Sequence, residues 1–114
     1  MAMALPERDL EKIRDIVLAL PGVKENATKL GTGWKVKGRL MACEAINRSA
    51  EANSLMACVS RDKRMRLMRE HPDVFYLTDH YRPYDAVLVR LLRIDRDSLR
   101  KVLESSWRFV RKSA

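Results

Sequence analysis

The chain has 114 residues and a formal net charge of +8, with 33% charged and 46% hydrophobic residues. This length allows one hydrophobic core, and this composition excludes a disordered or fibrous chain. No apolar run approaches the roughly 20 residues of a membrane-spanning helix, and two cysteines are too few for a disulfide-stapled secreted scaffold. We therefore expect one domain over residues 1–114, soluble in the reducing cytoplasm, with no membrane partner and with Cys43 and Cys58 as free thiols.

The first predicted element is an amphipathic helix that begins at Pro6 and ends near Ala19 or Leu20. Its apolar residues recur at helical spacing between charged ones: Leu10, Ile13, Val17 and Leu20. The helix ends there because Pro21 cannot continue it and Gly22 accepts the backbone conformations of a turn.

Three strands are predicted next, over residues 33–36, 40–43 and 55–59. The first two flank Lys37-Gly38-Arg39 and form a basic hairpin. A two-residue turn would place Arg39 on the side of Val36, whereas a three-residue loop aligns Trp34 and Val36 with Leu40 and Ala42. The apolar pattern favours the three-residue loop.

The second half of the chain predicts a short basic helix, two strands and a final helix. The basic helix runs from Ser60 or Arg61 to about Glu70, with Met65 and Met68 on its buried side. Strands follow over 75–78 and 86–91, and Asp95 caps the last helix.

The order α-β-β-β-α-β-β-α is typical of an α+β fold, an antiparallel sheet with helices packed on one face. Lys35 and Arg90 alternate with apolar residues, so we expect them to project from the opposite face. The apolar sides of the elements predict the core: Leu10, Ile13, Val17, Val36, Leu40, Val87, Val89, Leu99, Val102, Leu103 and Trp107.

Several segments together resemble the MmcQ/YjbR family, in an order and spacing that span most of the chain. They are the residues 19–23, 34–42, 72–82 and 87–91, followed by Trp107-Arg108 at the end. The resemblance implies a compact α+β fold similar to frataxin and a double-wing DNA-binding role, in which strand hairpins flank the helical layer. It supplies no catalytic residue. Lys37 departs from related chains, which often have glycine in this hairpin turn.

The positive charge is concentrated in parts of the chain, and residues 26–43 contain four bases and no acid. Clustered cations attract phosphates, which supply most sequence-independent affinity for nucleic acid. No helix-turn-helix, RNA-binding aromatic motif or zinc finger accompanies them, so base-specific readout is not expected. The leading hypothesis is a non-catalytic, weakly specific DNA-binding domain whose candidate nucleic-acid-binding residues are Lys35, Lys37, Arg39, Arg82 and Arg90. The alternative is a small-molecule or protein-interaction module that uses the open sheet face and has no nucleic-acid role.

Catalysis has one candidate constellation, Asp79-His80-Tyr81 with Tyr84. Adjacent strand residues point to opposite faces, and the sequence shows neither an obvious nucleophile nor a phosphate-cradling glycine loop. The separations of the cysteines and histidines fit no structural zinc site. We therefore expect no enzyme, no cofactor and no metal, and leave open a small molecule at the His80-Tyr81-Arg82 loop.

Overall fold

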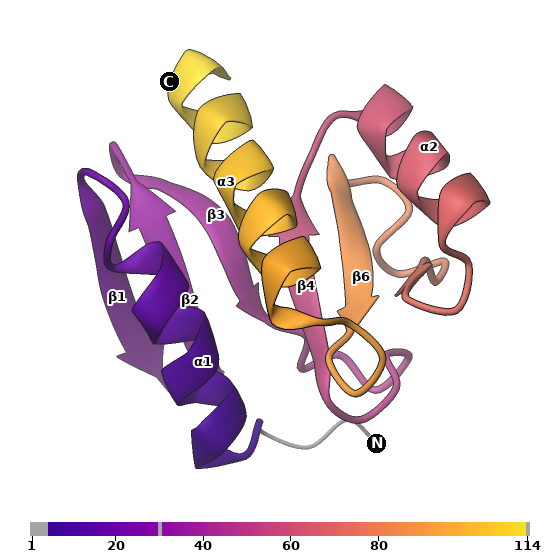
Figure 1. Cartoon of the computed structure of the whole chain (residues 1–114), viewed down its shortest axis with the longest axis horizontal. Helices are drawn as coiled ribbons and strands as arrows, with labels where there is room; N and C mark the ends of the chain where they lie inside the picture. Colours follow the sequence, from indigo (N-terminus) through magenta and orange to yellow (C-terminus); the bar gives the residue numbers. More distant parts are fainter. Residues whose placement is uncertain (1–4, 30, 114) are drawn as a thin grey trace.

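The computed structural model describes residues 5–29 and 31–113, which form a sheet with helices on one of its faces (Figure 1). Within these residues the helices are α1 (Glu7–Val17), α2 (Arg61–Glu70) and α3 (Arg96–Ser113). The strands are β1 (Val23–Thr28), β2 (Gly31–Val36), β3 (Arg39–Glu44), β4 (Ser54–Cys58), β5 (Phe75–Tyr76) and β6 (Ala86–Arg90).

The strands form one sheet in the order β1-β2-β3-β4-β6-β5, and every neighbouring pair is antiparallel. Helices α1 and α3 lie side by side across one face, and α2 lies beyond them next to β6 (Figure 1). Leu67 and Met68 of α2 pack against the same core. The predicted α+β fold with an antiparallel sheet and helices on one face is thus confirmed.

One strand more than predicted is present, because β1 precedes the predicted hairpin. Its sequence is mostly polar, and five of its six residues are exposed. As the edge strand it pairs only with β2, and polar side chains protect such an edge from pairing with other chains. Glu25 fastens it, because its Oε1 accepts hydrogen bonds from Trp34 Nε1 and from Arg14 Nε, each at 2.8 Å.

The β2–β3 hairpin has a two-residue turn, so the predicted three-residue loop is wrong. Lys37 and Gly38 have φ values of 52° and 76°, as in a type I′ turn, and Val36 pairs with Arg39. The register then shifts between Trp34 and Lys35, so that Trp34 pairs with Ala42.

The extra residue in β3 is Met41, and both Met41 and Trp34 are completely buried. This β-bulge restores the apolar register that the short turn displaced. It does so only beyond Leu40, which stays 38% exposed instead of entering the core as predicted.

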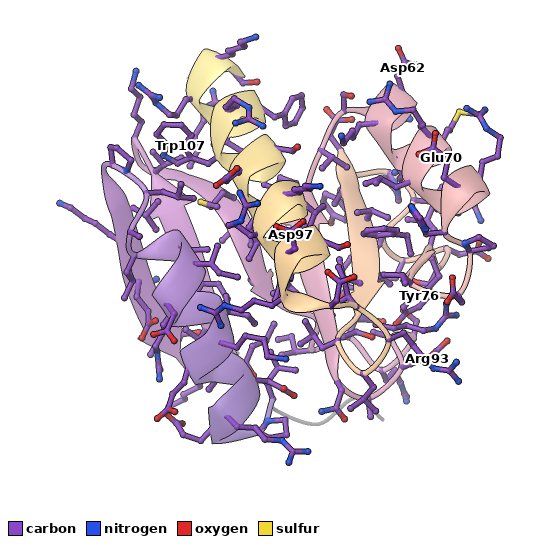
Figure 2. All side chains as sticks on the ribbon, in the orientation of Figure 1. Asp62, Glu70, Tyr76, Arg93, Asp97 and Trp107 are labelled. Atoms are coloured by element: carbon purple, nitrogen blue, oxygen red, sulfur yellow. The ribbon has the colours of Figure 1, made fainter. Side chains whose placement is uncertain are left out.

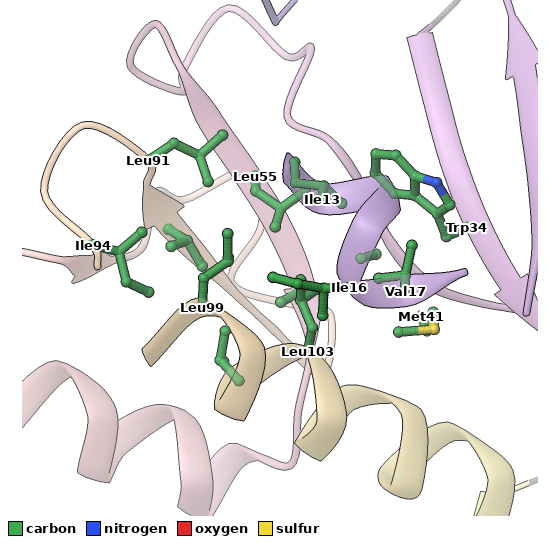
Figure 3. Close-up of a cluster of buried hydrophobic side chains, with 14 of the residues drawn as sticks. Ile13, Ile16, Val17, Trp34, Met41, Leu55, Leu91, Ile94, Leu99 and Leu103 are labelled. Carbon is green, nitrogen blue, oxygen red and sulfur yellow. The ribbon is translucent and has the colours of Figure 1, made fainter. Parts of the chain in front are cut away.

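The main core lies between the sheet and the helices α1 and α3, and Figure 3 shows side chains from both helices meeting those of the sheet. Apart from Leu40 and Trp107, all the predicted core residues are buried there. Trp107 is partly buried, and its Nε1 donates a hydrogen bond of 2.9 Å to the Pro21 carbonyl.

A second, smaller core occupies the opposite face of β4 and β6. Met56 and Leu88 project there and pack against Tyr81, which belongs to the loop before β6. Loops therefore cover this part of the face that the sequence left open. Farther along the same face, Lys24, Asn26 and Lys35 on β1 and β2 are exposed.

Candidate nucleic-acid interface

The β2–β3 hairpin presents three exposed bases. Lys35 lies on β2, Lys37 in the turn and Arg39 at the start of β3. In the part of the chain that the structure describes, none of the three forms an ion pair with a carboxylate. Their charges are therefore available to an external anion.

Two of these bases line a groove of about 560 Å³ together with Lys24 of β1 and Arg111 of α3. Pro21 and Val36 contribute apolar surface to the same groove. The Arg111 guanidinium lies 4.2 Å above the centre of the Trp107 ring, which fixes its position by a cation–π contact. Figure 2 shows Trp107 on the side of α3 that overlies the β2–β3 part of the sheet.

Lys24 and Lys35 are direct cross-strand partners on the exposed face of the sheet. Like charges in this arrangement repel each other and destabilise the strand pair by a few tenths of a kcal/mol, up to about 1 kcal/mol. An anion bound between them would remove that repulsion. An anionic ligand in the groove would therefore lower the electrostatic free energy of this strand pair.

The hairpin turn, the start of α2 and the end of α3 lie at the same end of the molecule (Figure 1). The groove lies at this end, between the hairpin turn and the end of α3. Lys63, Arg108 and Lys112 line a neighbouring depression, and Arg39 lines a third one beside Val110. We call this region the basic end. Its residues are Lys24, Lys35, Lys37, Arg39, Lys63, Arg108, Arg111 and Lys112.

Arg82 lies in the loop between β5 and β6 and is not part of the groove lining. Its Nη2 is 3.3 Å from Asp79 Oδ1, and both side chains are largely exposed. Such an exposed pair is weak and screened by salt. Arg82 therefore remains accessible to solvent, but the structure does not bring it together with Lys35 and Lys37.

Arg90 lies at the opposite end of the sheet, with partners of its own. Its guanidinium makes two hydrogen bonds of 2.9 Å to Glu51, bonds the carbonyls of Pro72 and Asp73, and lies 4.3 Å above the Tyr76 ring. The hydrogen bonds that Arg90 donates to Glu51 raise the pKa of Arg90. Figure 2 labels Tyr76 at the lower right, far from Trp107. Arg90 projects from the face expected, but it fastens β6 to the preceding turn and we leave it out of the interface.

Comparison with known proteins places the chain in a family. The YjbR family model matches residues 18–109. The chain belongs to the YjbR family. Uncharacterised proteins of Mycobacterium bovis and Mycobacterium tuberculosis are each 24% identical to it over 107 residues, which cover 82% of this chain and 83% of theirs. The crystal structure of Deinococcus radiodurans protein DR2400, with a DUF419 domain, gives a TM-score of 0.69 at 21% identity, covering 86% of this chain and 75% of that one. The resemblance found in the sequence is confirmed, and the structural likeness concerns the fold.

Sequence reasoning missed two groove residues of this YjbR-family chain. Lys24 was not recognised because β1 was not predicted, so its pairing with Lys35 had no basis. Arg111 is not among the candidate residues that the sequence gives. The spacing of Trp107 and Arg111, four residues apart on a helix, is the signal that would have found their stacked contact.

Two bases of α2, Arg64 and Arg61, serve the fold rather than the groove. Arg64 is buried, and its Nη1 donates to the carbonyls of Tyr84 at 2.8 Å and Ala86 at 3.2 Å. Burial lowers the pKa of Arg64. Arg61 forms an ion pair of 3.0 Å with Asp85. Met65, predicted to be buried, is instead 65% exposed because Arg64 occupies the inward side of the helix.

The proposed acid–base constellation is not assembled in this family member. Asp79 pairs with Arg82, while His80 is exposed and stands edge-on to Tyr81 with ring centres 4.8 Å apart. The hydroxyl of Tyr81 accepts a hydrogen bond of 3.3 Å from the Asn47 amide, and burial raises its pKa.

The next question is whether the described residues form a metal site. No three His, Cys, Asp or Glu residues of that part are grouped so that they could hold a metal ion. Cys43 and Cys58 are free thiols, and burial raises their pKa to about 11 and about 12. None of the helices within residues 5–29 and 31–113 is long and apolar enough to cross a membrane.

Proposed function

We propose that this protein binds DNA through phosphate contacts made by its basic end, without a catalytic step. The observation that supports the proposal best is the groove that four cations line, Lys24, Lys35, Lys37 and Arg111. In the described part of the chain, none of the four has a carboxylate partner. In this proposal the β2–β3 hairpin acts as one wing of a double-wing domain.

The same geometry favours backbone contacts over base contacts. The groove is formed by a hairpin, the edge strand and the last turns of a helix, and three of its four cations are lysines, which meet a phosphate as point charges. Binding should therefore be nearly independent of sequence. For four or five phosphate contacts the logarithm of the binding constant should fall with the logarithm of salt with a slope of roughly −4.

A triple variant tests the proposal. Replacing Lys24, Lys35 and Lys37 by Gln keeps the apolar stems over the sheet and removes three charges. The salt slope for a short duplex, measured by fluorescence anisotropy from about 50 to about 200 mM salt, should flatten by about 0.9 for each lost phosphate contact.

The matched control replaces Arg8, Arg66 and Arg69 by Gln, since these three are exposed and lie outside the groove. It removes the same formal charge and should leave the slope unchanged. Equal losses in both variants would mean that DNA responds only to net charge. If the unmodified protein binds no duplex at about 50 mM salt, DNA binding is refuted.

A further inference from the structure

A cleft of about 450 Å³ opens at the basic end, beside the groove. It exists because β3 and β4 separate there. Their pairing runs from Glu44 and Leu55 to Ala42 and Ala57, and beyond the bulge β3 departs from β4. The Cys58 thiol, which donates to the Leu40 carbonyl at 3.2 Å, spans the gap. Residues of the loop before β6 and of the last turns of α3 form the other walls.

The lining of this cleft is mainly apolar and partly aromatic. Leu40 and Met56 form one side, and Phe109 and Val110 of α3 form another. Leu40 and Tyr84 are 38% and 55% exposed, and both line this cleft. Large apolar side chains exposed around one concave site are typical of ligand-binding surfaces, because a bound apolar group removes their surface from water.

The unpaired charge at the rim of the cleft has one sign. Asp85 is already paired with Arg61, at 3.0 Å. Arg39 has no carboxylate partner among the described residues, so its guanidinium is the unsatisfied charge of the rim. The rings of His80 and Tyr84, whose centres are 6.4 Å apart, complete the rim with polar edges.

We infer that this cleft binds a small amphipathic anion, with an apolar planar body and a single carboxylate or a similar acidic group. The body lies between Tyr84 and Phe109 over Leu40 and Met56, and the acidic group bonds to the Arg39 guanidinium. A planar acidic group suits the arginine fork, which bonds it through two parallel hydrogen bonds. The size of the cleft lies within the range of small-molecule sites. This inference does not rest on DNA binding, because the groove and the cleft share no lining residue; Arg39 belongs to the basic end but not to the groove.

Calorimetric titration with 2-naphthoate, and with 2-naphthylmethanol as its uncharged analogue, tests the inference. Arg39→Gln should raise the dissociation constant for 2-naphthoate about tenfold, since it removes one charge-assisted contact. The same variant should leave the affinity for the alcohol unchanged. Lys37→Gln is the matched control, because Lys37 lies two residues away in the same hairpin but does not line the cleft.

A second variant fills the cleft. Ser113 lies in the exposed last turn of α3 and lines the cleft, so Ser113→Trp should block both probes without disturbing the core. Methyl NMR locates the probe independently of the variants. Addition of 2-naphthoate should shift the Met56 methyl resonance, whereas that of Met65, on the outer side of α2, should not move.

Three results would overturn the inference. One is the absence of binding by either probe at about 1 mM. Another is an equal loss of 2-naphthoate affinity in Arg39→Gln and Lys37→Gln, which would mean general attraction by the basic surface. The third is undiminished binding to folded Ser113→Trp, or a probe-induced shift at Met65 but not at Met56.

Discussion

Reversing one charge in the groove should stabilise the protein and weaken DNA binding at the same time. Lys24 faces Lys35 directly across the β1–β2 pair, on the exposed side of the sheet. Lys24→Glu exchanges a repulsive cross-strand pair for an attractive one. Each of these pairs is worth about 0.2–1 kcal/mol, so the free energy of unfolding should rise by about 0.5–1.5 kcal/mol.

Thermal unfolding measures the first effect. For a domain of this size about 1 kcal/mol corresponds to roughly 4 °C in Tm, so the variant should melt about 2–6 °C higher at low salt. The gain should shrink in about 1 M salt, where the screening length is only about 3 Å. Lys24→Gln, which removes the repulsion without adding attraction, should gain about half as much.

DNA binding measures the second effect, in the opposite direction. The variant loses one phosphate contact and places a carboxylate among Lys35, Lys37 and Arg111, so affinity should fall and the salt slope should flatten by about 0.9. A variant that melts lower at low salt would refute the repulsion between the two lysines. A stabilised variant with unchanged DNA affinity would remove Lys24 from the interface.

Three further predictions concern side chains that serve the fold. Arg64→Met should lower the free energy of unfolding by about 2–4 kcal/mol in urea titrations, because buried carbonyls that bond Arg64 lose their donor. Arg90→Met should lower the free energy of unfolding by about 1 kcal/mol in the same assay. It should leave the salt slope of DNA binding unchanged, whereas loss of an interface cation would flatten that slope. The hydrogen bond from Arg14 lowers the pKa of Glu25. The stabilisation of the fold by the ionised Glu25 is therefore complete above the unfolded-state pKa of about 4.3 and is lost as the pH falls through the lower folded-state pKa. The Tm difference between the unmodified protein and Glu25→Gln should accordingly narrow as the pH is lowered below about 4.

The two ends of the sheet show which parts of the fold the sequence reveals. Helix α3 is predictable because its apolar residues repeat within one continuous segment and need no partner to be recognised. Strand β1 has no such repeat. Its polar residues lie at the edge and its stability comes from β2 and from the bonds between Glu25 and its two partners, so only the folded chain identifies it as a strand.

The length of the β2–β3 turn is a second feature that the sequence pattern does not determine. The apolar pattern correctly aligns Trp34 with Ala42, but it does not distinguish a longer loop from a shorter turn followed by a bulge. Both give the same register beyond the bulge. They differ at Leu40, which the longer loop would bury and the bulge leaves partly exposed at the cleft.

For the candidate site, the sequence pattern of a strand shows whether a cationic side chain is exposed, but not whether an acidic side chain from elsewhere in the chain pairs with it. Lys35 and Arg90 both alternate with buried neighbours, and both project from the side opposite the main core. Arg90 is neutralised by Glu51, which lies 39 residues away in the chain and reaches it only after folding. No comparable partner reaches Lys35 within the described residues, and its direct neighbour across the sheet is Lys24. The charge pattern along a chain therefore identifies clustered cations, but it does not show which of them lack a carboxylate partner in the folded protein.

The division of labour between arginine and lysine supports the proposed mode of binding. Arg64 and Arg90 each bond several oxygens at once, a role for which the rigid, multiply donating guanidinium is suited. The groove relies instead on Lys24, Lys35 and Lys37, flexible and strongly hydrated point charges that need no fixed partner geometry. Flexible point charges can follow the phosphates of any duplex, but they cannot read a base edge with the bidentate geometry that discrimination requires. A groove in which three of the four cations are lysines should bind DNA with a steep salt dependence and little preference for sequence.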